Sequence, residues 1–144
     1  MVLKEHYRRI PQNLEEMVGM NRVLIVSNNE PSKEWLTGLI KSVGYEAYQS
    51  SGNIEDVKNI IKAYDIDVVL LDIQENNDVL LDLGRKLKRE KECLVVALEP
   101  LEDDLLKKSG EIGLDDVLLK PLDLHQLKVI MELIQQVKSF HIAR

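Results

Sequence analysis

Five short runs of apolar residues recur at even spacing along this chain. They are Val23–Val26, a weaker run at Glu46–Tyr48, Val68–Leu71, Leu94–Leu98 and Val117–Leu119. Their first residues lie about 20–27 positions apart, which is the length of a strand, a helix and two loops. Several runs are continuously apolar and rich in Val, Leu and Ile, as is typical of parallel strands that are covered on both faces.

Amphipathic helical patterns fill the gaps between these runs. The predicted apolar stripes are Trp35, Leu36, Leu39, Ile40 and Val43; Ile54, Val57, Ile60, Ile61 and Tyr64; Val79, Leu80, Leu83 and Leu87; Leu101, Leu105 and Leu106; and Leu127, Ile130, Met131, Ile134 and Val137. Pro31 suits a first helical turn, Asn53 and Asp123 suit N-caps, and Gly44 suits a helix end. Strands that alternate with helices predict an α/β fold, a doubly wound parallel sheet with about five helices on both faces.

The pattern divides the chain into three segments. Residues 1–21 form an N-terminal extension, residues 22–138 form the domain, and residues 139–144 form a C-terminal tail. We expect the extension to be loosely ordered, and a docking element is the alternative.

Composition narrows the classes of function. Apolar residues make up 44% of the chain and charged residues 31%, as in a globular protein. The formal net charge of −6 argues against general nucleic-acid binding, which needs clustered Lys and Arg. The single cysteine, Cys93, excludes an internal disulfide and a Cys-based zinc site. No apolar run approaches the roughly 20 residues of a membrane span, so we expect a cytoplasmic protein without membrane contact.

Polar residues follow three of the predicted strands. Ser27 and Asn28 come after the first strand, Asp72 ends the third, and Lys120 follows the fifth. In an open parallel sheet, functional side chains gather at the carboxyl ends of the strands. If these strands are neighbours, the polar residues converge at one edge of the sheet.

The sequence resembles a response-regulator receiver domain over about residues 22–138. The resemblance rests on Val23-Leu24-Ile25-Val26 followed by Pro31, on Asp67-Val68-Val69-Leu70-Leu71-Asp72-Ile73, on Gly113-Leu114-Asp115-Asp116, and on Leu119-Lys120-Pro121-Leu122-Asp123-Leu124. It implies a five-stranded sheet in the flavodoxin-like order 2-1-3-4-5. It also implies a switch in which an acidic pair and an aspartate hold Mg²⁺, and the aspartate accepts a phosphoryl group from a histidine kinase. A lysine, usually joined to proline by a cis peptide bond, pairs with the phosphate.

Two site residues of the family match this chain. Asp72 matches the phosphoacceptor and Lys120 matches the phosphate-pairing lysine, with Pro121 fixing the geometry of its loop. The other matched positions depart from the family. The acidic pair falls on Ser27 and Asn28 or on Asn28 and Asn29, the signalling Thr or Ser position on Leu98, and the aromatic position on Val117.

These departures predict a pseudo-receiver. Lys120 can neutralise Asp72 directly, so the site no longer requires a metal, and amides are poor replacements for the carboxylates that Mg²⁺ prefers. We therefore expect no enzyme activity, no cofactor and no metal. One alternative is an active receiver that binds Mg²⁺ through Glu30, Glu75 or Asp78. Another is a small-molecule-binding domain on the same fold.

The expected partners are proteins. The resemblance implies a histidine kinase or an output protein, and also a homodimer through the face of the fourth helix, the fifth strand and the fifth helix. Val129 and Leu133 lie together at the margin of the apolar stripe of the last helix, and they are the candidate interface residues.

Overall fold

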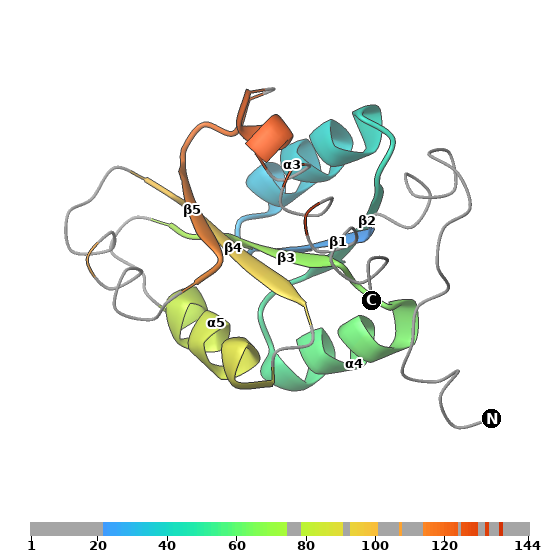
Figure 1. Ribbon diagram of the computed structural model, residues 1–144, viewed down its shortest axis with the longest axis vertical. Helices are drawn as coiled ribbons and strands as arrows, with labels where there is room; N and C mark the ends of the chain where they lie inside the picture. Colours follow the sequence, from blue (N-terminus) through green and yellow to red (C-terminus); the bar gives the residue numbers. More distant parts are fainter. Residues whose placement is uncertain are drawn as a thin grey trace.

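The protein is built around one parallel β-sheet with helices on both faces (Figure 1). The computed structural model describes residues 22–74, 79–90, 93–100, 107, 114–123, 125–129, 132 and 136. Along the chain these form β1 (Arg22–Val26), α3 (Glu30–Ser42), β2 (Glu46–Ser50), α4 (Ile54–Tyr64), β3 (Val68–Asp72), α5 (Val79–Glu90), β4 (Leu94–Glu99) and β5 (Asp116–Leu119).

The strand order is β2-β1-β3-β4-β5, and every neighbouring pair is parallel. This confirms the doubly wound order predicted from the sequence. The registers place Asp72 beside Leu98, and Glu99 beside Leu119. The carboxyl ends of β1, β3, β4 and β5 therefore lie at one edge of the sheet.

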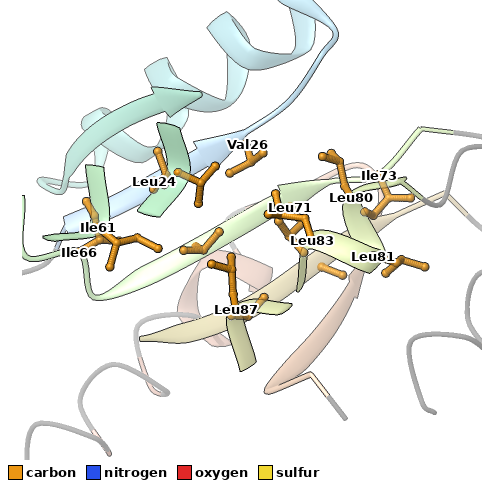
Figure 2. Packing of buried hydrophobic residues seen from close by; sticks show 14 residues of the cluster. Leu24, Val26, Ile61, Ile66, Leu71, Ile73, Leu80, Leu81, Leu83 and Leu87 are labelled. Atoms are coloured by element: carbon orange, nitrogen blue, oxygen red, sulfur yellow. The ribbon is translucent and has the colours of Figure 1, made fainter. Parts of the chain in front are cut away.

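Two apolar clusters cover the two faces of the sheet. α4 and α5 pack on one face, where Leu24 and Val26 of β1 meet Leu71 of β3, Ile61 of α4 and Leu83 of α5 (Figure 2). α3 lies on the opposite face (Figure 1). There the second cluster includes Leu36, Ile40, Val68, Leu70, Leu98, Leu118, Leu122 and Leu127. β1 and β3 are buried on both faces, which explains their continuously apolar sequences.

Polar side chains cap the helices, and the cap of α4 was predicted. The Asn29 side chain caps α3 by accepting a 2.9 Å hydrogen bond from the backbone N–H of Ser32, and Pro31 lies in the first turn. Asn53 caps α4 in the same way, as predicted. Gly44 follows α3 with a φ of 93°, a backbone conformation that glycine adopts without strain.

Three residues assigned to apolar stripes are exposed. Trp35 is 54% exposed, Tyr64 is 50% exposed and Val79 is 66% exposed, so the expectation that they face the core is wrong. In α3 the buried side includes Lys33 and Thr37 together with Leu36 and Ile40. The buried face is thus rotated away from Trp35, because neighbouring helical positions differ by about 100°.

Some expected elements lie partly outside the described residues. Of the stripe at Leu101–Leu106 nothing is described, and only Lys107 is described nearby. Residues 125–129 are helical where the last helix was predicted. Asp123 caps this segment, since its Oδ1 accepts a 2.9 Å hydrogen bond from the Gln126 N–H. The extension (1–21) and the tail (139–144) lie outside the described residues. None of the described helices is long and apolar enough to span a membrane.

Candidate site at the carboxyl edge of the sheet

The structure brings Ser27, Asp72 and Lys120 together. Asp72 is the last residue of β3, Ser27 directly follows the adjacent β1, and Lys120 directly follows β5. Asp72 and Ser27 are both fully buried. Parallel strands end at the same edge, so the three side chains meet although their positions in the sequence are far apart.

Both carboxylate oxygens of Asp72 contact polar neighbours. Oδ2 accepts a 2.6 Å hydrogen bond from the Ser27 hydroxyl and a 3.0 Å hydrogen bond from the Gln74 side-chain amide. The Lys120 ammonium lies 2.8 Å from Oδ1. Within the described part of the chain Oδ1 accepts no well-aligned hydrogen bond, so the lysine acts on it mainly through charge. A buried carboxylate requires such compensation.

The positions matched to the acidic pair serve local structure. The Ser27 hydroxyl contacts the backbone of Asn29, accepting from its N–H at 3.2 Å and lying 3.3 Å from its carbonyl oxygen. The Asn29 side chain is used as the helix cap of α3. Asn28 is exposed, and among the described residues its side chain makes no hydrogen bond to Asp72.

Lys120 is held by its backbone as well as by Asp72. Its N–H donates a 2.8 Å hydrogen bond to the carbonyl of Glu99, which continues the ladder between β4 and β5. The Lys120–Pro121 peptide bond is cis, as the resemblance implies. The Lys120 side chain is 26% exposed, so it contacts both Asp72 and the solvent.

Leu98 and Val117 contribute apolar side chains near this edge of the sheet. Leu98 is buried beside Asp72 and belongs to the cluster on the α3 face. Val117 is half-buried and packs against the cluster on the opposite face. Pro121 is exposed.

Sequence reasoning missed two residues of this edge. Gln74 reaches back to Asp72 from the loop after β3, and only its position two residues after a strand-ending aspartate could have indicated it. Glu99 ends β4 and is fully buried, although glutamate is seldom buried. Its place in an otherwise apolar run, Leu94–Glu99, was the available signal.

Within the part of the chain that the structure describes, the residues around Asp72 supply few of the ligands that Mg²⁺ prefers. Among the described residues, no group of three or more His, Cys, Asp or Glu side chains is arranged to hold a metal ion. Asp72 is neutralised by Lys120, and Glu30, a proposed substitute ligand, pairs with Lys33 at 2.8 Å. Glu75 and Asp78 lie outside the described residues. Mg²⁺ favours carboxylate and water oxygens, whereas Ser27 and Asn28 offer neutral groups.

Comparison with known proteins assigns the class. The model of the response regulator receiver domain matches residues 23–132, which is most of the chain. The chain belongs to the response regulator receiver family, whose members are signalling modules of two-component systems.

The individual relatives are distant. The aerobic respiration control protein ArcA of Escherichia coli K12 is 27% identical over 108 residues, covering 74% of this chain and 45% of that protein. The sensory transduction protein LytR of Staphylococcus saprophyticus is 23% identical over 116 residues, covering 80% of this chain and 46% of that protein. The chain thus spans less than half the length of these curated relatives.

Solved structures share the fold. A CheY-like receiver domain from Methylobacillus flagellatus superposes with a TM-score of 0.65 at 26% identity, covering 79% of this chain and 98% of that one. A receiver domain protein from Clostridium thermocellum gives a TM-score of 0.70 at 20% identity, covering 83% and 98%. At this lower identity the likeness concerns the fold alone.

Proposed function

We propose that this receiver domain signals by binding proteins and does not depend on phosphorylation. The observation that carries the proposal is the set of contacts around Asp72. Its oxygens are contacted by Ser27, Gln74 and Lys120, all of which belong to this chain. In this proposal Asp72 is a structural ion-pair partner and has no catalytic role.

Charge explains why phosphoryl transfer is disfavoured. A transferring phosphoryl group builds negative charge that a divalent cation normally stabilises. Ser27 and Asn28 supply no carboxylate for such a cation. The attacking oxygen of Asp72 would also have to give up hydrogen bonds or its ion pair with Lys120 before it could react.

Acetyl phosphate provides the direct test. The purified chain is incubated with acetyl phosphate and Mg²⁺, and its intact mass is measured. We expect no added phosphoryl group, while a receiver with a complete acidic pair, treated in parallel, gains one. A gain of one phosphoryl group that disappears in Asp72→Asn would overturn the proposal in favour of an active receiver with atypical ligands.

The partner in this proposal is a histidine kinase or an output protein that docks at the β5 edge. Leu119, at the end of β5, is 40% exposed there. Val129 is half-buried and packs against the apolar cluster on the α3 face. It therefore contributes to the core as well as to the proposed docking surface. Leu133 lies outside the described residues. A homodimer through this face and a cytoplasmic location remain predictions.

Val129→Glu and Leu133→Glu test this surface. We expect weaker capture of the partner by a Leu133→Glu chain whose circular dichroism matches the parent. Val129→Glu should also lower stability, because it places a charge against the core. Unchanged partner capture by a folded Leu133→Glu chain would remove this face from the proposal.

A further inference from the structure

The outer face of α3 contains an exposed aromatic residue beside a glycine. The exposed residues of this face are Pro31, Glu34, Trp35, Gly38, Lys41 and Ser42. At 100° per residue, all of them lie within about 60° of Gly38, which is at the centre of the face. Trp35 is 54% exposed and is the only tryptophan of the chain. Exposed tryptophan is a typical anchor of protein interfaces.

Packing within the described part of the chain does not explain Gly38. A Cβ atom built on it meets no atom of the described residues within 4 Å, and its φ is not among the positive values. Glycine inside a helix lowers stability relative to alanine. The open space therefore faces outward, where the absence of a side chain lets another backbone approach closely.

We propose that a second copy of this chain packs here, with the two α3 helices antiparallel and crossing at Gly38. In such a pair the dyad is perpendicular to both helices, so residues on the same flank of the face meet. Glu34 then lies opposite Lys41 of the second copy, and Lys41 lies opposite its Glu34. On the other flank, Trp35 covers the gap at the second Gly38 and reaches its Leu39 and Ser42.

The charges of the face are self-complementary in this arrangement. Lys41 forms no ion pair with any described residue, and it is available to a second copy. Glu34 accepts one 3.2 Å hydrogen bond from the exposed Gln49 side chain, which leaves its other oxygen for the lysine. A parallel pair of α3 helices would instead bring like charges to the same level.

The expected complex is weak. α3 has 13 residues and is about 20 Å long, so one crossing buries less area than a stable dimer needs. Self-association should therefore depend on concentration. It uses none of the residues around Asp72, so Asp72→Asn should leave it unchanged, which separates this inference from the proposed function.

Sedimentation velocity from micromolar to millimolar concentration tests the proposal. We expect a monomer–dimer equilibrium that Glu34→Lys or Lys41→Glu weakens about tenfold, because the dyad turns each substitution into two like-charge contacts. The combined Glu34→Lys/Lys41→Glu chain should associate like the parent. Lys62→Glu is the matched control, because Lys62 is an exposed basic residue in the last turn of α4.

Gly38→Gln and Trp35→Ser complete the test. Both should weaken self-association, and Gly38→Gln should do so without loss of thermal stability, because its side chain enters open space. A parent that stays monomeric throughout would overturn the proposal, even if its α3 face bound a different protein. Failure of the combined charge exchange to restore self-association would also overturn it.

Discussion

Two of the lysine–carboxylate pairs among the described residues lie near β5, and they differ in their exposure to solvent. At the carboxyl edge of the sheet, Lys120 contacts Asp72 at 2.8 Å. Lys88 of α5 contacts Asp115, just before β5, at 2.9 Å. Asp115 also accepts a 2.7 Å hydrogen bond from the Val95 N–H, so it ties α5, β4 and β5 together.

The carboxylates of Asp72 and Asp115 have the same kind of polar contacts. Each is contacted by one lysine and by hydrogen-bond donors of the same chain. They differ in exposure, because the Asp72 side chain is fully buried whereas those of Asp115 and Lys88 are 22% and 25% exposed. Asp72 therefore resembles Asp115 in its contacts and is more deeply buried.

Adding carboxylates at the Asp72 site should have the largest effect. Ser27→Asp combined with Asn28→Asp replaces a hydrogen-bond donor to Asp72 by a like charge. Without metal, we expect the free energy of unfolding to fall by about 4 kcal/mol, as for an uncompensated buried charge. Mg²⁺ should restore part of it, because the ion binds the folded chain.

Denaturant unfolding with and without Mg²⁺ measures both effects. Asn28→Asp alone is the control, since Asn28 is exposed and one added carboxylate there should change stability little. If the double variant and the parent respond equally to Mg²⁺, the matched positions of the acidic pair are wrong.

Removal of the lysine at the same site should have the next largest effect. In Lys120→Met, Asp72 stays buried and, among the described residues, keeps only its bonds from Ser27 and Gln74, so we expect the free energy of unfolding to fall by about 3 kcal/mol. Urea unfolding provides the measurement, with Lys128→Met as an exposed control. A loss no larger than that of the control would mean that the ion pair does not stabilise the fold.

The corresponding change at the second pair should be smaller. In Lys88→Met the Asp115 carboxylate keeps its bond from Val95 and remains partly hydrated, so we expect a loss of about 1 kcal/mol. The same urea unfolding compares both variants. Equal losses for Lys88→Met and Lys120→Met would contradict the claim that depth of burial separates the pairs.

Apolar periodicity supported the prediction of the strands and of most helices. The strand order and the meeting of Asp72 with Lys120 followed from the resemblance to receiver domains, because periodicity does not order strands. The sequence did not support the details that tertiary packing decides. Whether Trp35 or Lys33 faces the sheet depends on how α3 is rotated about its axis. The apolar pattern of its sequence allows either rotation. The bond from Gln74 to Asp72 depends on a loop conformation, and loops carry no periodic signal.

The smallest change in the free energy of unfolding at neutral pH is expected at a buried polar group that has no compensating partner. The Tyr45 hydroxyl is buried and has no hydrogen-bond partner among the described residues, unlike Asp72 and Asp115. Its removal in Tyr45→Phe should raise the free energy of unfolding at neutral pH by about 0.5 kcal/mol. A fall in the free energy of unfolding of this size or larger would show that the hydroxyl has a compensating partner.

The same tyrosine predicts a dependence on alkaline pH. Burial raises the pKa of Tyr45 to about 12, from the ordinary value of 10.0. Between these two pKa values the folded chain keeps a proton that the unfolded chain loses. The free energy of unfolding therefore does not depend on this group below pH 10, and it falls as the pH rises from about 10 to 12. Urea unfolding across this range should show a steeper fall for the parent than for Tyr45→Phe, by about 3 kcal/mol in total. Parallel pH profiles of the two proteins would mean that the hydroxyl ionises in the folded state as readily as in water.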